Sequence, residues 1–296
     1  MFRTFLQLGR VSNLPTVWTN LTAAWLLGGG SLIEARLGGL LLGGSLLYLA
    51  GMALNDAAGA PFDRQHKQER PIPQGLVRER TVWIFGSTCL ASGSLALSFA
   101  GAPLLFVAAI VALILGYTFT HKRWKGCILL MGGIRACLYL IGGASALRLD
   151  PHFASDQLFL IHPIITIWAS AVGLYTVLLT RTARCEYPDS QGKPTLPPAL
   201  FFIPVAATLA TCLLLPELTA QTIVFFLLIL VSYLLWLGWV RTDLRTGKTG
   251  FAVGKLLAGI ALIDALAVSA THPYFALPFL ALPPFLLLWQ KVVPAT

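Results

Sequence analysis

Charge is the scarcest property of this sequence. Only 11% of the 296 residues are Asp, Glu, Lys or Arg, whereas 56% are hydrophobic and the mean hydropathy is +0.76. A water-soluble protein of this composition could not cover its apolar surface with polar side chains. The composition therefore excludes a soluble globule and predicts an all-α polytopic membrane protein.

Cysteine and acidic residues are also few. The five cysteines lie mostly within apolar runs and form no CxxC pair, so we interpret them as small apolar side chains rather than disulfide or metal-binding residues. Twelve acids against 21 Lys and Arg give a formal net charge of +9. We attribute this excess to membrane topology and to contact with membrane lipids, and expect no nucleic-acid partner.

Long apolar runs make up most of the chain. Runs of about twenty residues, enough to cross a hydrocarbon core of roughly 30 Å, cover 14–33, 37–55, 80–100, 102–121, 126–147, 158–181, 197–215, 219–240, 251–271 and 274–291. The last two are less regular, because Lys255 and Asp264 interrupt one and prolines interrupt the other. We therefore predict nine to ten transmembrane helices around a central cavity that opens toward the cytoplasmic face.

The basic residues predict an orientation. If the N-terminus is cytoplasmic, only Arg36 and Arg148 of the 21 Lys and Arg lie outside, Arg135 and Lys255 lie within runs, and the other seventeen are cytoplasmic. This asymmetry follows the positive-inside rule. We expect an integral protein of a bacterial inner membrane. Its polar cytoplasmic loops would be 55–79, 121–126, 181–196 and 241–250.

Two acidic clusters follow apolar runs that end on this cytoplasmic side. Asp56 and Asp63 are seven residues apart, so on a continuous helix they share a face, roughly 10 Å apart along the axis. Glu186 and Asp189 are three residues apart and also share a face. Together with the amide of Asn55, these carboxylates suit Mg²⁺, which binds carboxylate, water and phosphate oxygens. Each cluster alone could equally be a set of ordinary helix-end charges.

Cations for a diphosphate are available on the same side. Arg70, Lys122, Arg123 and Lys193 all fall in the predicted cytoplasmic loops.

The stretches 48–73 and 174–197 also share an order of parts: an apolar helix, then acids, then a base, then proline. This similarity favours an internal duplication within a single domain, 1–296, with halves of about 1–125 and 126–296.

These residues resemble a known family. Asn55 and Asp56, followed by Asp63 and by RPIP at 70–73, are similar to the first aspartate-rich motif, NDxxDxxxD, of the UbiA superfamily of intramembrane prenyltransferases. The similarity covers nearly the whole chain. It includes acids after the sixth run, YTFTHKR at 117–123 and RVSNLPTVWTN at 10–20.

The resemblance implies a Mg²⁺-dependent enzyme that moves a prenyl group from a prenyl diphosphate to an aromatic acceptor of the quinone or 4-hydroxybenzoate precursor type. The implied metal ligands are Asn55, Asp56, Asp63, Glu186 and Asp189, of which the four acids are the implied catalytic residues. Arg70 and Lys122 would contact the diphosphate. Tyr117 would lie beside the diphosphate or the allylic cation.

Two positions depart from the family pattern. Gly59 replaces the middle aspartate with Pro61 nearby, which removes a ligand and predicts a broken helix. The second motif reads RCEYPD, with Pro188 inside it. An alternative function is therefore a protein that has lost turnover and binds or helps to move an isoprenoid lipid. A secondary transporter is disfavoured because the acids lie at the membrane edge rather than at its midplane.

Arg135 is the most unusual charge, about 13 Å into its run, where an unpaired charge costs several kcal/mol. Asp264 lies at a comparable depth in another run, which predicts an Arg135–Asp264 ion pair. The pair could be structural, or Arg135 could bind a carboxylate of the acceptor or a phosphate oxygen. Lys255 lies nearer the cytoplasmic edge, where we expect it to snorkel.

Overall fold

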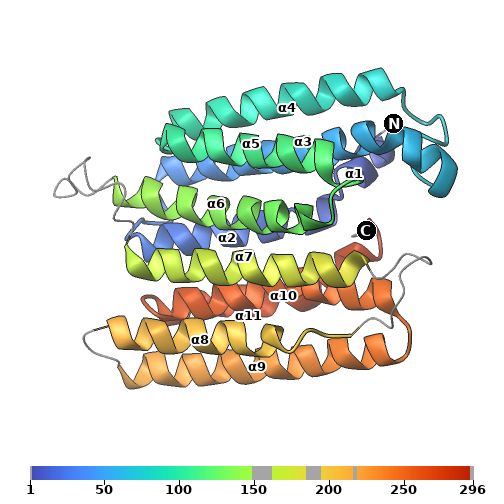
Figure 1. The fold of residues 1–296 in the computed structure, drawn as a ribbon. Helices are drawn as coiled ribbons and strands as arrows, with labels where there is room; N and C mark the ends of the chain where they lie inside the picture. Colours follow the sequence, from blue (N-terminus) through green and yellow to red (C-terminus); the bar gives the residue numbers. More distant parts are fainter. Residues whose placement is uncertain (1, 149–161, 185–194, 216–218, 294–296) are drawn as a thin grey trace.

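A computed structural model describes residues 2–148, 162–184, 195–215 and 219–293 (Figure 1). All regular structure within these residues is helical. The α-helices are α1 (Phe2–Leu8), α2 (Pro15–Leu27), α3 (Ala35–His66), α4 (Glu79–Phe99), α5 (Leu104–Thr120), α6 (Ile128–Leu147), α7 (Pro163–Ala183), α8 (Ala199–Leu214), α9 (Ala220–Arg245), α10 (Thr249–Ser269) and α11 (Ala276–Gln290). The 3₁₀ helices are η1 (Val11–Asn13), η2 (Lys125–Cys127) and η5 (Pro273–Phe275).

The ten predicted apolar runs correspond to the helices from α2 to α11, which lie roughly parallel in Figure 1. In the described part of the chain, seven helical segments are long and apolar enough to cross a membrane: α3, α4, α6 with η2, α7, α9, α10, and α11 with η5. α5 and α8 are apolar but shorter. The fold is thus that of an integral membrane protein. The count of nine to ten crossings, the cavity's orientation and the internal duplication stay predictions.

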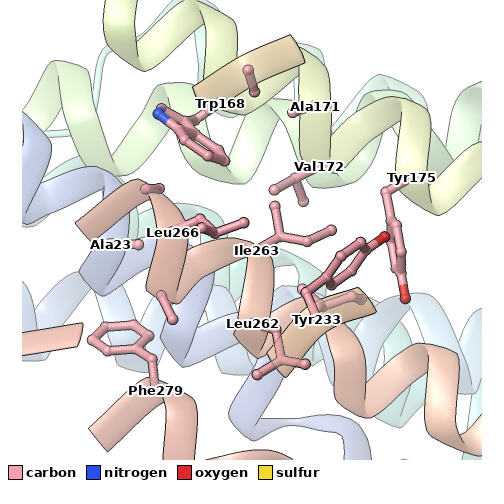
Figure 2. Packing of buried hydrophobic residues seen from close by; sticks show 14 of the residues in the cluster. Ala23, Trp168, Ala171, Val172, Tyr175, Tyr233, Leu262, Ile263, Leu266 and Phe279 are labelled. Atoms are coloured by element: carbon pink, nitrogen blue, oxygen red, sulfur yellow. The ribbon is translucent and has the colours of Figure 1, made fainter. Parts of the chain in front are cut away.

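The core is centred on α10, which is buried along almost its whole length and contacts α2, α7, α9 and α11. Figure 2 shows Ile263 and Leu266 of α10 beside Trp168 and Val172 of α7, with Phe279 of α11 also in the cluster. The outer helices α4 and α9 instead expose large apolar side chains. That distribution suits a bundle whose outer surface faces lipid rather than water.

The predicted break at Pro61 is wrong, because α3 continues without interruption to His66. Proline removes only one backbone hydrogen bond, the one to the carbonyl of Ala57, and its own side chain is exposed. Residues 55–66, predicted as the start of a loop, are therefore helical. As a result, the face of α3 that carries Asp56 and Asp63 is continuous with the membrane-embedded part of the helix.

α6 and α7 pack through a close approach of two glycines, Gly132 and Gly173. A Cβ atom built on Gly132 would lie 2.5 Å from Val177 Cγ2 and 2.7 Å from the carbonyl oxygen of Gly173. The second atom belongs to the backbone, so it cannot move aside without separating the helices. Small residues that let helices approach closely are a common means of association inside membranes.

Gly132→Val should lower the free energy of unfolding by about 1–3 kcal/mol, because it overpacks this helix crossing. Gly238→Val is the matched control, since nothing lies within 4 Å of a Cβ built at this exposed position of α9. Unfolding of both variants in detergent micelles measures the difference. Equal effects at the two positions would contradict the α6–α7 contact.

Candidate functional site

The C-terminal part of α3 presents a row of polar residues at helical spacing. Asn55, Asp56 and Asp63 are all buried, and only 1% of Asp63 is exposed. Gly59 lies between them on the same face. The prediction that Asp56 and Asp63 share one face of a continuous helix is confirmed, because both contact the same partner.

That partner is Arg70, from the segment that follows α3. Its Nη1 atom lies 3.1 Å from Oδ1 of Asp56 and 2.7 Å from Oδ2 of Asp63. Between α3 and Arg70 the chain turns, with the backbone N–H of Lys67 donating to the Asp63 carbonyl and that of Arg70 donating to the Lys67 carbonyl. A single nitrogen thus bridges two buried carboxylates.

Two further cations complete the site. Lys122 Nζ lies 3.2 Å from Oδ1 of Asp63 and 4.2 Å from the centre of the Phe62 ring, and Arg10 Nη2 lies 3.5 Å from Oδ1 of Asp56. We call Arg10, Asp56, Asp63, Arg70 and Lys122 the acid–base cluster. Three basic and two acidic side chains leave it one formal positive charge, which favours the binding of an anion.

The α3 residues can supply part of a metal site. No group of three or more His, Cys, Asp or Glu that could hold a metal occurs among the described residues. Asn55, however, directly precedes Asp56 in α3, and its Oδ1 atom is buried with no hydrogen-bond partner among the described residues. Two carboxylates and an amide oxygen are the hard donors that Mg²⁺ uses, with water or phosphate filling the remaining positions. These three residues therefore fit a Mg²⁺ ion.

Gly59 accommodates the side chain of Lys122. A Cβ at this position would lie 3.2 Å from Lys122 Cε and 3.4 Å from Oδ2 of Asp63. A larger residue here would press against both side chains. In this sequence a lysine therefore lies where the family pattern would bring a third carboxylate.

An apolar cavity adjoins the acid–base cluster along α3. Its lining residues on α3 are Gly44, Leu47, Tyr48, Gly51 and Met52, and α2, α5 and α6 form the other walls. Arg10 connects the two regions, because its guanidinium contacts both Met52 Sδ, at 3.6 Å, and Asp56. The same helix face is therefore apolar in the membrane and charged at its end.

Tyr117 of α5 also lines this cavity, and the His121 ring stacks on it with centres 5.4 Å apart. The Nδ1 atom of His121 is 2.9 Å from the carbonyl of Thr118. Burial lowers the pKa of His121 below its ordinary value, so the imidazole stays neutral at pH 7. The cations of the cluster are accordingly the arginines and the lysine.

Arg135 lies on the cavity wall, but its predicted ion pair with Asp264 is wrong. Its guanidinium donates to Oδ1 of Asn20 at 2.9 Å and to Oγ1 of Thr16 at 2.8 Å. The Asn20 amide nitrogen in turn donates to both carboxylate oxygens of Asp264, each at 2.9 Å. The prediction compared only how deep Arg135 and Asp264 lie in their apolar runs. That comparison could not reveal that Asn20 lies between the two charges.

Lys255, which we expect to snorkel toward the membrane edge, has an acidic partner. Lys255 is buried, and its Nζ lies 2.6 Å from Asp243 Oδ2 and 3.4 Å from the centre of the Trp239 ring. Asp243 lies two residues before the end of α9 at Arg245, and snorkelling of Lys255 toward the membrane edge stays a prediction.

The structure thus brings together Asn55, Asp56, Asp63, Arg70 and Lys122, and places Tyr117 and Arg135 on the adjoining cavity wall. Arg123 is exposed and forms no salt bridge within the described residues. Glu186, Asp189 and Lys193 lie outside the described residues, so their predicted approach to α3 stays a prediction.

Sequence reasoning missed Arg10 as a member of the site and missed Thr16 and Asn20 as partners of Arg135. Arg10 adopts a left-handed backbone conformation, φ 42°, between α1 and η1, which the residue type does not signal. The polar residues Thr16 and Asn20 inside an otherwise apolar run were the available clue, since polar groups buried in a membrane protein need partners.

Comparison with known proteins adds a family and a fold. A model of the UbiA prenyltransferase family matches residues 16–263. The apo structure of a UbiA homolog from Aeropyrum pernix K1 is 19% identical with a TM-score of 0.60, covering 86% of this chain and 95% of that chain. A digeranylgeranylglyceryl phosphate synthase is 16% identical with a TM-score of 0.58, covering 96% of this chain and 99% of that chain. No curated protein matches the sequence.

Arg70→Met and Asp63→Asn should show a coupling energy of about 1–3 kcal/mol in a double-mutant cycle, because the pair is buried and in direct contact. Unfolding in detergent micelles measures it. The exposed Arg64–Glu79 pair, at 2.8 Å, is the matched control and should couple by less than about 1 kcal/mol. Similar coupling energies in both pairs would show that the buried Arg70–Asp63 pair stabilises the protein no more than an exposed pair does.

Proposed function

The chain belongs to the UbiA prenyltransferase family, and we propose that it is a Mg²⁺-dependent prenyltransferase that moves a prenyl group from a prenyl diphosphate to an aromatic acceptor. The acceptor class that we propose is a quinone or 4-hydroxybenzoate precursor. One observation carries the proposal: a single face of α3 lines an apolar cavity and then ends in the acid–base cluster. A prenyl diphosphate has the same two parts.

In this proposal, Mg²⁺ would be held by Asn55, Asp56 and Asp63 together with Glu186 and Asp189. When bound, Mg²⁺ neutralises the charge that develops on the leaving diphosphate. Support for the first set comes from the buried carboxylates on one face and from the unpartnered oxygen of Asn55. The assignment of Glu186 and Asp189 as metal ligands rests on the sequence alone.

The remaining charge of the diphosphate would be bound by fixed cations. Arg70 and Lys122 already contact the aspartates, so an anion held at these carboxylates through a metal lies within their reach. Arg10 adds a third positive charge at the edge of the apolar cavity. Preorganised cations of this kind stabilise charge on a leaving group without costly rearrangement. Arg123 and Lys193 would contribute from the loops nearby.

The proposed reaction breaks the bond between the allylic carbon and the diphosphate oxygen, and the diphosphate leaves with the electron pair. A ring carbon of the acceptor then forms a bond to the allylic carbon, and the ring loses a proton. The apolar cavity would keep water away from the cation and hold the prenyl tail. Tyr117, on its wall, offers an aromatic face that can stabilise a cation.

A second candidate function is binding of an isoprenoid lipid without turnover. Gly59 motivates it, because Lys122 occupies the space beside Asp63 where a further carboxylate would otherwise lie. The cluster then has a net positive charge and could bind a diphosphate without ionising it. Release of diphosphate from a labelled prenyl diphosphate distinguishes the two functions.

Asp56→Asn and Asp63→Asn should each reduce Mg²⁺-dependent release of diphosphate from labelled geranyl or farnesyl diphosphate by about 10²–10³-fold, because each removes charge from the proposed metal site. Glu34→Gln is the control, since this exposed acid precedes the opposite end of the same helix. Normal release in both aspartate variants would refute the proposed metal site. No release by the unaltered protein with any chain length and several acceptors would favour the binding function.

Gly59→Asp should lower the Mg²⁺ concentration for half-maximal diphosphate release by on the order of tenfold, because an added carboxylate strengthens a site made of few charged ligands. Gly59→Asn is the matched control of the same size without the charge. A Mg²⁺ titration of the three proteins measures the shift. If Gly59→Asp and Gly59→Asn need the same Mg²⁺ concentration for half-maximal release, residue 59 does not face the metal.

A further inference from the structure

We propose that Arg135 forms a second polar site in the same cavity, where it binds the anionic group of the prenyl acceptor, with Thr16, Asn20 and Asp264 as positioning residues. The ligand chemistry is a carboxylate or a phosphate attached to an apolar or aromatic body. This inference rests on the proposed prenyltransferase function and specifies its acceptor.

The first reason is a buried charge without a direct anionic partner. Arg135 is 8% exposed and lines the apolar cavity. Within the described residues, no carboxylate lies within salt-bridge distance of its guanidinium, and its two hydrogen-bond partners are neutral. Asp264, the nearby acid, is reached only through the neutral Asn20, and charged residues inside a membrane usually serve a ligand or a partner. An anion in the cavity would be such a ligand.

The second reason is that the guanidinium is held in place but not saturated. It has five N–H donors, and the hydrogen bonds to Thr16 and Asn20 use two of them. Asn20 is itself fixed, because its amide nitrogen donates to both oxygens of the fully buried Asp264. α2 and α10 thereby orient Arg135 on α6 while donors remain for a ligand.

The third reason is that the prenyl diphosphate does not need Arg135. The acid–base cluster already supplies three cations at the end of α3. Tyr48, which shares the cavity wall with Arg135, precedes Asp56 by eight residues, or roughly 12 Å along the helix. One cavity therefore has two separate anion-binding regions. A substrate anchored at Arg135 would direct its body toward the reacting end of the prenyl chain.

Binding of paired probes to the purified full-length protein tests the proposal. The anionic probes are 4-hydroxybenzoate and a long-chain ether of glycerol 1-phosphate. Their neutral partners are 4-hydroxybenzyl alcohol and the corresponding glycerol ether. We expect at least one anionic probe to bind about tenfold more tightly than its neutral partner, and Arg135→Gln to abolish that difference. Arg135→Lys should retain part of it, because it keeps the charge.

The two probe pairs also separate the sources of the anion. Preference for 4-hydroxybenzoate identifies a carboxylate acceptor, and preference for the glycerol phosphate identifies a phosphate-bearing lipid.

Equal binding of anionic and neutral partners to the unaltered protein would overturn the proposal, as would a preference that survives in Arg135→Gln. If Arg135→Gln does not fold, Thr16→Val keeps the charge but removes one positioning bond. This variant should weaken anionic binding alone, and equal weakening of both partners would also overturn the proposal.

These binding measurements need no turnover. Diphosphate release by the unaltered protein, measured with a labelled prenyl diphosphate, Mg²⁺ and several acceptors, tests the prenyltransferase function separately. A protein that releases diphosphate but shows no preference for anionic probes would refute only the Arg135 site. A protein that prefers the anionic probes through Arg135 but never releases diphosphate would refute only the transferase function.

Discussion

A single contact organises the candidate site: one nitrogen of Arg70 bridges Asp56 and Asp63. Two buried carboxylates on one helix face would otherwise repel each other in a medium of low dielectric constant. The bridge also ties the segment after α3 to the helix and brings a cation over the end of the apolar cavity. With Arg10 and Lys122, the result is a positively charged end on an apolar slot, which matches a lipid that ends in a diphosphate.

Buried charges in the interior of the bundle are also stabilised by neighbouring groups. Among the described residues, each charged side chain deep in the bundle has polar or aromatic partners. Arg135 reaches Asp264 through Asn20, and Lys255 contacts Asp243 beside an aromatic ring. These contacts join α2 to α6 and α10, and α10 to α9. Because such groups cannot be left without partners in lipid, they fix how the helices around the cavity are placed. The packing of the fold and the geometry of the site therefore have a common cause.

The helices were predictable because membrane thickness imposes a length and a hydropathy that the sequence displays directly. Most of the acid–base cluster was also predictable, since a seven-residue spacing places Asp56 and Asp63 on one face of any continuous helix. Contacts between distant segments were not, because hydropathy and spacing describe one helix at a time. The continuity of α3 through Pro61, the approach of Arg10 and the intervening Asn20 all depend on which helices become neighbours.

Electron paramagnetic resonance of Mn²⁺ in place of Mg²⁺ tests the central claim most directly, because hyperfine coupling to ³¹P appears only when a phosphate oxygen binds the metal. With a non-hydrolysable prenyl thiodiphosphate, the unaltered protein should show this coupling, and the double variant Asp56→Asn, Asp63→Asn should lose it. Unchanged coupling in the double variant, or none in the unaltered protein, would contradict the assignment of α3 as the metal and diphosphate site.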